Sequence, residues 1–376
     1  MIYTVAIVGL IAMLFASIPR NSVFRYGLEV AWLIIFVFLA IRYDFGNDYM
    51  AYKNAFDYQS MIGPFEIDEE AHHEPGWQFL NYLFRSYGFT ALVVVLTAFE
   101  CFVFYSFIKE YVPYKYYWFS IFLYVFDPNN LLIGASMMRN TLAIALFIWS
   151  IRYIKRRKLF PYLITIFLAT QVHSSAIVLY PVYLLGYVKQ IKLNKWGYSI
   201  IIILYLWLSF GVSQSELSNT IQNVAALAGE EQALEYYTAG AVFQEGGSGL
   251  GAILLLYIFC YLIFTLYKRS DNVRLLFLIL VIGTFVKPFA LIVPMIGRFA
   301  YYFNIFGIVC FPIILGGEKE KYLQGERLPS LYTPQEYGRL GAIMCIVLIT
   351  IYSYCQFFQN PVWIEKFSTY HTIFEL

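Results

Sequence analysis

The sequence predicts an all-α protein, a polytopic transmembrane helical bundle of about 10–12 spans. Of its 376 residues, 60% are hydrophobic and 13% are charged, whereas a soluble domain is about half apolar and about a quarter charged. Apolar runs long enough to cross a bilayer recur along the chain, and basic residues gather in alternate loops. These observations predict one integral membrane domain over 1–376 and exclude a soluble enzyme.

The predicted spans follow one another as apolar runs, beginning with a run that has no basic n-region and is therefore a span, not a cleavable signal. The two short runs that flank His173 are either two spans joined by a tight turn or a re-entrant hairpin. Asp127-Pro128-Asn129-Asn130 interrupts another run and predicts an unwound helix end. The runs are 2–18, 26–41, 89–108, 116–134, 136–153, 159–172, 175–188, 197–212, 250–267, 272–287, 295–315 and 340–358.

Alternate loops between these runs are rich in lysine and arginine, which the positive-inside rule assigns to the cytoplasm. Both termini are then on the outer face, as are two long loops, about 42–88 and about 213–249. The first loop is rich in aromatic residues, which argues against disorder. The basic loops contain Arg20 and Arg25; Lys109 and Lys115; Lys155, Arg156, Arg157 and Lys158; Lys189, Lys192 and Lys195; Lys268, Arg269 and Arg274; and Lys319, Lys321, Arg327 and Arg339.

Composition also limits the partners and cofactors. The formal net charge is only +2, so no nucleic-acid partner is expected. The five cysteines lie in or beside apolar runs without a CxxC pair, which is typical of small buried hydrophobic residues. His72 and His73 adjoin Glu74, but further ligands at suitable spacing are absent from the sequence, so no metal site is predicted.

Four basic residues lie in or at the outer edge of apolar runs: Arg42, Arg139, Lys287 and Arg298. A charge at membrane depth costs about 3 kcal/mol on insertion scales, so each is expected to face a partner or a polar cavity unless it snorkels to the outer headgroups. Arginines that converge there would form an anion site, because a guanidinium grips phosphate oxygens with two bonds at once. Asp48 and Glu74 flank the same surface.

Several short motifs occur in an order that resembles the EpsG family, and the resemblance covers most of the chain. One departure is Asn140, where the family commonly has glutamine after the arginine. The motifs are Arg42 with Gly46, Asp48, Tyr49 and Tyr52; Glu74-Pro75-Gly76; Met138-Arg139; His173-Ser174-Ser175-Ala176; and Arg298 with the nearby Tyr301.

The resemblance implies a Wzy-like polymerase of bacterial exopolysaccharide, capsule or O-antigen, with a GT-C-like architecture. Such an enzyme is an inverting, metal-independent glycosyltransferase of the inner (plasma) membrane without a cofactor. At the outer face it transfers a glycan from an undecaprenyl diphosphate donor to a lipid-linked acceptor, and a chain-length regulator is a further partner.

The resemblance and the residues together suggest roles for the site. Cations would stabilise the diphosphate leaving group, and aromatic rings would contact the glycan. The predicted substrate-binding residues are Arg42, Arg139, Arg298, Tyr49, Tyr52, Trp77, Asn140 and Tyr301. The acceptor hydroxyl must lose its proton to Asp48, Glu74 or His173. The choice stays open, with Glu74 favoured because Pro75 restricts its backbone.

Two other classes of function remain open. A transporter or flippase for a lipid-linked sugar also needs arginines, although these often line a path through the bundle, whereas the candidates here gather near one face. An O-antigen ligase uses the same donor with a different acceptor. A sugar O-acyltransferase is less favoured, because outer-face cations suit a diphosphate better than a thioester.

Overall fold

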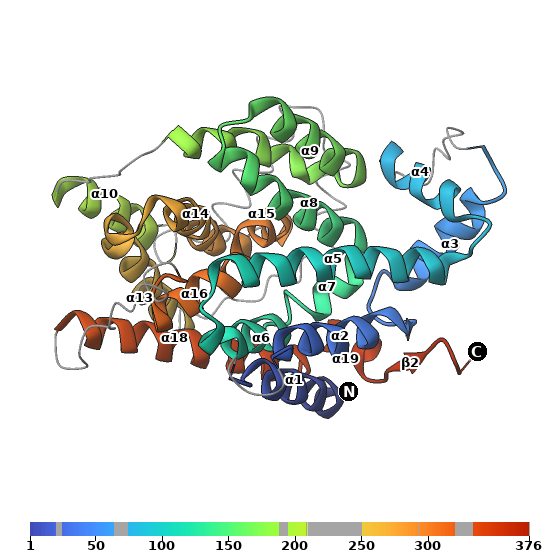
Figure 1. Cartoon of the computed structure of the whole chain (residues 1–376), viewed down its shortest axis with the longest axis horizontal. Helices are drawn as coiled ribbons and strands as arrows, with labels where there is room; N and C mark the ends of the chain where they lie inside the picture. Colours follow the sequence, from blue (N-terminus) through green and yellow to red (C-terminus); the bar gives the residue numbers. More distant parts are fainter. Residues whose placement is uncertain are drawn as a thin grey trace. The chain divides into compact units, whose positions relative to one another are not determined.

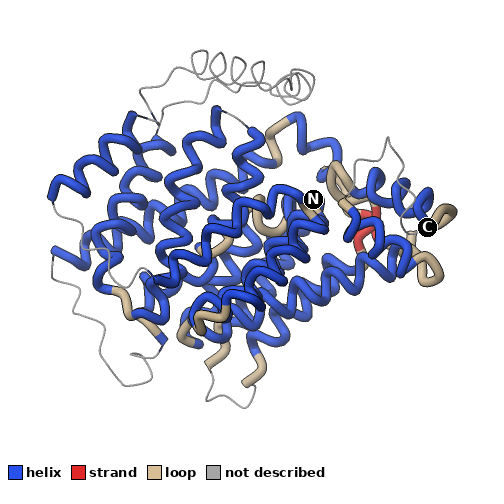
Figure 2. Tube along the Cα trace, turned by 90° about the horizontal axis from the view of Figure 1, so that it is seen from above, coloured by secondary structure: helices blue, strands red, loops and turns tan. Residues whose placement is uncertain are grey.

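The computed structural model describes residues 1–19, 25–63, 74–187, 195–207, 209, 250–292, 294–319 and 334–375. Its described elements are helices, apart from one pair of two-residue strands beside the C-terminus (Figures 1 and 2). This confirms the predicted all-α class. The chain divides into two compact units: Met1–Gly186 with Gly307–Ser330 and Thr350–Leu376, and Tyr187–Phe306 with Leu331–Ile349.

The first unit contains the N-terminal half of the chain and its C-terminal tail. Its helices are α1 (Ile2–Ala16), α2 (Gly27–Ala40), α3 (Tyr49–Gln59), α4 (Pro75–Phe84), α5 (Phe89–Tyr111), η1 (Tyr114–Tyr116), α6 (Tyr117–Phe126), α7 (Leu132–Ser136), α8 (Met138–Lys155), α9 (Leu159–Val172), η2 (Ser174–Tyr187), α16 (Gly307–Gly316) and α19 (Pro361–Phe367). Its strands are β1 (Arg42–Tyr43) and β2 (His371–Thr372).

The second unit has a core of aromatic and aliphatic residues in which Tyr205 stacks on Phe259 with ring centroids 4.2 Å apart. Helix α18 (Pro334–Phe357) begins among its residues and ends among those of the first unit. The other helices are α10 (Lys195–Leu206), α13 (Leu250–Thr265), η4 (Leu266–Lys268), α14 (Asp271–Ile292) and α15 (Pro294–Asn304). The predicted outer loop 213–249 lies outside the described residues.

Within the described part of the chain, three helical stretches are long and apolar enough to cross a membrane: Phe89–Tyr111, Phe299–Gly316 and Glu336–Phe357. Several further apolar helices contain 10–17 residues. A span needs about 17–25 residues, so the short helices leave the predicted count of spans untested. The composition and these helices together indicate a multi-pass membrane protein.

The predicted break in the run 116–134 is confirmed. Helix α6 ends at Phe126, and the Asp127 carboxylate accepts hydrogen bonds from the backbone and side-chain nitrogens of Asn129, at 3.1 and 2.9 Å. The Asn130 amide donates to the Leu123 carbonyl at 3.0 Å, which satisfies an acceptor at the helix end. The chain can therefore leave the helix and turn into α7 and α8, the helix that contains Arg139.

The predicted loop 42–88 is folded where the structure describes it. Helices α3 and α4 pack on α5 through a buried aromatic cluster that includes Tyr49, Tyr52, Trp77 and Phe89. Full burial of a large apolar side chain contributes about 1.5–3 kcal/mol, so this cluster holds the two helices firmly. Met138 and Val172 join the same cluster, which brings the start of α8 and the end of α9 to it.

The C-terminal tail lies beside the segment that follows α2. Strand β2 pairs antiparallel with β1, with Thr372 opposite Arg42, and the Tyr370 ring stacks on Phe38 with centroids 4.7 Å apart. The tail is therefore on the same side as the Arg42 segment. The predicted topology requires this arrangement, although the orientation of that side stays a prediction.

Candidate active site

Glu74 is the N-cap residue of α4, immediately before the first helical residue. Its backbone carbonyl accepts hydrogen bonds from the amides of Trp77 and Gln78, at 3.0 and 3.2 Å, while Pro75 occupies the first helical position. Proline is favoured there because its fixed φ suits the helix and its missing N–H would have no partner. This local sequence fixes the direction in which the Glu74 side chain leaves the chain.

Glu74 connects two distant segments through its carboxylate. Oε2 accepts a hydrogen bond from Arg139 Nη1 in α8, and Oε1 accepts one from the Ser174 amide at 2.7 Å. His173 Nδ1 lies 3.5 Å from the same Oε1. At that distance the imidazole forms an ion pair when protonated, although the contact is long for a hydrogen bond. Three of the motifs in the sequence therefore meet at one carboxylate.

The close approach of α4 to the end of α9 depends on Gly76. A Cβ atom on this residue would lie 2.7 Å from both the carbonyl oxygen and the Cβ of Gln171, which is closer than real contacts allow. The absence of a side chain lets the start of α4 reach the turn that contains His173. Close packing therefore explains why glycine occupies position 76 of the Glu-Pro-Gly motif.

The surroundings of Glu74 keep it ionised. Burial alone would raise the pKa of this carboxyl group, but the contacts with His173, the charge on Arg139 and the Ser174 amide together lower the pKa to about 2. Both oxygens already have partners. Such a group holds positive charge and orients its neighbours well, but it is a weak proton acceptor at neutral pH.

His173 is held rigidly at the end of α9. Its amide donates to the Ala169 carbonyl at 2.9 Å, and its own carbonyl accepts from the Ala176 amide at 3.0 Å. Its side chain is only 10% exposed. Among the described residues, neither ring nitrogen has a hydrogen-bond partner. Nδ1 faces Glu74, and Nε2 is buried without a hydrogen-bond partner in the described part of the chain.

Aromatic residues surround the cation of this cluster. The Arg139 guanidinium lies 5.7 Å from the centroid of the Tyr52 ring, and Tyr52 packs against Trp77 with ring centroids 5.4 Å apart. Trp77 Nε1, Asn140 Oδ1 and Arg139 Nε are buried without a hydrogen-bond partner in the described part of the chain. An unsatisfied buried polar group costs about 1–3 kcal/mol, so several in one place are typical of a site that receives a polar ligand.

Arg42 belongs to a second cluster, in which protein groups accept hydrogen bonds from Nη1 and Nη2 of its guanidinium, while Nε has no partner among the described residues. It is 3% exposed and donates to the Leu39 carbonyl, to Thr97 Oγ1 at 3.1 Å and to the Ala135 carbonyl at 3.4 Å. The hydroxyl of Tyr49, which is also buried, donates to the Arg42 carbonyl at 3.2 Å. Arg42 thus ties α2, α5 and α7 together, and this geometry favours a structural role over the predicted contact with a diphosphate.

The loop after Arg42 is shaped against α7. Gly46 has a φ of +98°, which favours glycine, and a Cβ on it would lie 2.7 Å from Ser136 Cβ. The Asp48 amide donates to Ser136 Oγ at 3.2 Å. Asp48 is half-buried at the start of α3, so its predicted catalytic role remains untested.

The residues that surround the Arg42 side chain were not predicted from the sequence. Glu100 is 8% exposed and interacts electrostatically with Arg42, and Thr97 on the same helix accepts its hydrogen bond. The signal was present, because Glu100 is the one acidic residue in the apolar run 89–108. Ser174 was overlooked for another reason: it contributes its backbone amide, which any residue except proline would supply.

The remaining predicted residues lie in the second unit or outside the described residues. Arg298 and Tyr301 lie on α15, where the side chain of Arg298 is outside the described part, and Lys287 lies on α14. Their predicted roles stay predictions. His72 and His73 are also outside the described residues. Within those residues, no group of three His, Cys, Asp or Glu could hold a metal ion.

The helices and this cluster define a multi-pass membrane protein in which a carboxylate, an arginine and a histidine gather at the ends of helices. The model of the EpsG family matches residues 28–324, which include every residue of the two clusters except those of the C-terminal tail. The chain therefore belongs to the EpsG family, which is linked to exopolysaccharide synthesis. No curated protein and no solved structure matches it.

Proposed function

We propose that this protein is an inverting glycosyltransferase that polymerises undecaprenyl-diphosphate-linked oligosaccharide repeat units at the outer face of the membrane. The observation that carries the proposal is the meeting of Glu74, Arg139 and His173 at one carboxylate. A carboxylate that orients an imidazole is the arrangement that general base catalysis needs. Membership of the EpsG family supports the polysaccharide substrate class.

In the proposed reaction, a hydroxyl oxygen of the acceptor sugar attacks the anomeric carbon of the donor glycan. The new carbon–oxygen bond forms as the bond from that carbon to the diphosphate oxygen breaks, on the opposite side, which inverts the configuration. The hydroxyl proton passes to His173 Nε2, and undecaprenyl diphosphate leaves with the electron pair. Glu74 stabilises the imidazolium that forms.

This assignment changes the order of the three candidates for the base. Glu74 was favoured from the sequence, but its pKa of about 2 and its occupied oxygens suit an orienting role. His173 has the unpaired ring nitrogen that a base requires. Asp48 stays the alternative, and it lies on the same folded loop.

The diphosphate would be bound by Arg139, and the role of Arg298 stays a prediction from the sequence. Arg139 uses Nη1 on Glu74 and keeps Nε without a partner among the described residues, so it can turn donors to an anion. The rings of Tyr52 and Trp77 are buried and support the Arg139 side chain. The sequence had suggested that these rings contact sugar rings. Asn140 offers an unpaired amide oxygen for a sugar hydroxyl.

The test is incubation of the purified protein with defined lipid-linked repeat units, followed by sizing of the products. A polymerase yields a ladder that grows by whole repeat units. Transfer of one preformed glycan to a different acceptor would instead identify a ligase. Movement of the lipid-linked sugar across vesicle membranes without growth would identify a transporter. Either result would refute the proposal.

The proposal also requires the site to face outwards. A cysteine at Gly63 and one at Gly247 should react with an impermeant reagent added to intact cells, whereas a cysteine at Arg157 should react only after the membrane is opened. The expectation follows from the alternation of basic loops. Labelling of the Arg157 position in intact cells would place the site on the wrong side.

A further inference from the structure

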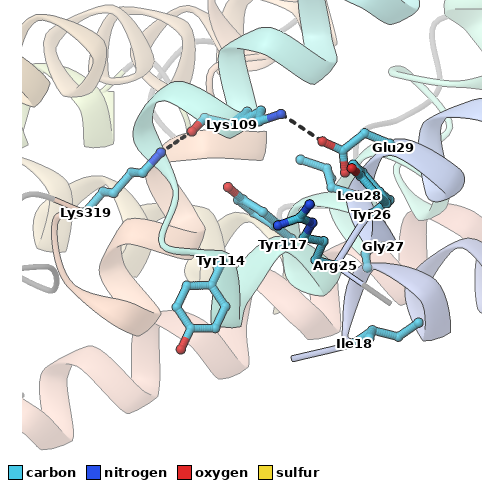
Figure 3. A pocket seen from close by; sticks show the side chains of 11 residues that line it. Ile18, Arg25, Tyr26, Gly27, Leu28, Glu29, Lys109, Tyr114, Tyr117 and Lys319 are labelled. Atoms are coloured by element: carbon cyan, nitrogen blue, oxygen red, sulfur yellow. Dashed lines mark hydrogen bonds and ion pairs between the residues drawn. The ribbon is translucent and has the colours of Figure 1, made fainter. Parts of the chain in front are cut away.

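A cavity of about 350 Å³ lies in the first unit beside the start of α2, the end of that helix away from Arg42 (Figure 3). It is bounded by the end of α1, the start of α2, the end of α5 and the start of α6. Its lining is unusually polar for a helical bundle. The polar residues that line it are Arg25, Tyr26, Glu29, Lys109, Tyr114, Tyr117 and Lys319.

Among the described residues that line this cavity, cations outnumber anions, because Arg25, Lys109 and Lys319 accompany one carboxylate, Glu29. Glu29 Oε1 accepts hydrogen bonds from Lys109 Nζ at 2.7 Å and from the Tyr105 hydroxyl at 2.8 Å. Lys319 Nζ donates to the Lys109 carbonyl, as Figure 3 shows. The cavity is thus positively charged overall, and the positive-inside rule assigns this side to the cytoplasm.

A second, apolar groove of about 320 Å³ runs between α2 and α5 and shares Glu29 with the cationic cavity. Leu33 and Phe102 on its walls are 57% and 52% exposed, which in a membrane protein means that they face hydrocarbon. The other apolar lining residues are Trp32, Phe36, Ala98 and Cys101. A charged cavity that continues into an apolar groove matches the shape of an amphiphile.

Trp32 adds an independent observation. It lines the groove and is 4% exposed, yet its indole Nε1 has no hydrogen-bond partner among the described residues. A buried indole N–H normally finds an acceptor. The ester carbonyl that joins a glycerol backbone to an acyl chain is an acceptor at the boundary between a charged headgroup and hydrocarbon, where Trp32 lies.

We propose that the two adjoining cavities form one binding site for an anionic glycerophospholipid of the cytoplasmic leaflet. The phosphate lies against Arg25, Lys109 and Lys319, an ester carbonyl accepts from Trp32, and one acyl chain follows the groove between α2 and α5. Basic pockets between transmembrane helices on the cytoplasmic side bind anionic lipid headgroups by the same chemistry. A polyprenyl phosphate lacks the ester carbonyl, and inorganic phosphate lacks the chain.

This site is separate from the proposed active site, and its occupant is a structural ligand. It would stabilise the folded protein by mass action, because a lipid that binds the native state alone shifts unfolding to higher temperature. The segment that it would hold begins α2, the helix that leads into Arg42.

The experiment uses the full chain in phosphatidylcholine vesicles with increasing phosphatidylglycerol that has brominated acyl chains, which quench nearby tryptophan. The signal of Trp32 is the difference between the wild type and Trp32→Phe. We expect saturable quenching by brominated phosphatidylglycerol and much weaker quenching by brominated phosphatidylcholine. The double variant Arg25→Gln/Lys319→Gln should lower the apparent affinity at least about tenfold, since each basic contact contributes separately.

The control is Lys115→Gln, which removes a positive charge from the connection between α5 and α6 at a residue that does not line the cavity. It should bind like the wild type. Ala98→Phe fills the groove from an exposed position and should weaken binding of long-chain phosphatidylglycerol while leaving a dihexanoyl analogue unaffected. This variant keeps the test decisive if the double variant folds poorly.

Each contrary outcome identifies a different error. Equal quenching by the two brominated lipids would show that the anionic headgroup does not contribute to binding, and it would overturn the proposal. Competition by millimolar inorganic phosphate as strong as that by the lipid would point to a soluble anion. Preference for undecaprenyl phosphate over phosphatidylglycerol would point to a polyprenyl ligand. Either of these last two results would refute a glycerophospholipid.

Discussion

Arg42, which is buried, and Arg139, which is half-buried, lie in one compact unit and differ in their partners. Arg42 donates to two backbone carbonyls and a threonine hydroxyl, all neutral. Arg139 donates to Glu74, a carboxylate that also contacts His173 and the Ser174 amide. The first arrangement uses its guanidinium to join helices. The second gathers an arginine, a carboxylate and an imidazole at one point.

The comparison teaches that membrane depth alone does not assign an arginine to a function. Both residues carry the same insertion cost, about 3 kcal/mol, and both belong to motifs of the family. What separates them is the kind of hydrogen-bond partner, which is a set of neutral groups at Arg42 and a carboxylate at Arg139. Conservative replacement at each position should therefore affect different properties, and the following predictions use that difference.

Replacement of each arginine by lysine gives the largest expected contrast. Arg139→Lys should lower the single-turnover rate about 10²–10³-fold, the usual effect of losing a transition-state donor, because an ammonium cannot reproduce the guanidinium fork. Arg42→Lys should lower thermal stability and leave the rate per folded molecule unchanged. Thermal unfolding in detergent and single-turnover kinetics would be measured on both. The comparison fails if Arg42→Lys is the inactive, stable variant.

Glu74→Gln should destabilise the protein by about 3 kcal/mol at pH 7, because it leaves Arg139 buried without its anionic partner. The pKa of Glu74 is lowered to about 2, so the stability that its charge contributes is complete above the pKa of an unfolded glutamate. That contribution is lost as the pH falls through about 2. The difference between wild type and variant should therefore shrink below about pH 4.5. A difference that does not change with pH would show that the carboxylate is not held ionised.

Gly46→Ala should cost about 2 kcal/mol, since its φ of +98° strains any other residue and its Cβ would meet Ser136. Because Gly46 belongs to the loop after Arg42, where the contacts are structural, the variant should lose stability without a change in the pH profile of the rate. The double variant with Ser136→Gly removes the steric contact and should recover part of the loss. Complete recovery would mean that the backbone conformation contributes nothing.

Thr97→Val should have the smallest effect, about 1 kcal/mol, because it removes one neutral acceptor of Arg42 while two carbonyls remain. The matched control is Thr170→Val, an exposed threonine whose hydroxyl donates within its own helix. Chemical denaturation would compare the two. An equal effect at both positions would show that the contact between Arg42 and Thr97 contributes no net stability.

Much of this arrangement could be predicted from the sequence. The apolar runs predicted the helices, and Asp127-Pro128-Asn129-Asn130 predicted where one of them ends. The order of motifs predicted which residues matter, and a partner for Arg139 was expected among the acidic residues of the outer loop. The run 295–315 was expected to be one span, and Phe299–Gly316 is long and apolar enough to be one, with a two-residue turn between α15 and α16 after Asn304 that the sequence did not predict.

The pairing inside the site could not be predicted. Sequence separation gives no information on whether Glu74 reaches Arg139, 65 positions away, or Arg42. The contact depends on Gly76, which lets α4 approach Gln171, and on the backbone amide of Ser174. Glu100 is a single acidic residue in an apolar run, and nothing in the sequence indicates that its helix passes beside Arg42. The roles of Glu74 and His173 depend on which atoms are already paired, and only the structure reveals that.

The central claim is that His173 accepts the proton while Glu74 only orients it. The most direct test is the single-turnover rate between pH 5 and pH 8 for the wild type, His173→Gln and Glu74→Gln, with donor binding measured alongside. Histidine is the side chain whose charge changes in this range, whereas Glu74 stays ionised throughout it. The account predicts a rate that rises with pH in the wild type and a slow, flat profile in His173→Gln with donor binding retained. A normal, rising profile in His173→Gln would contradict it.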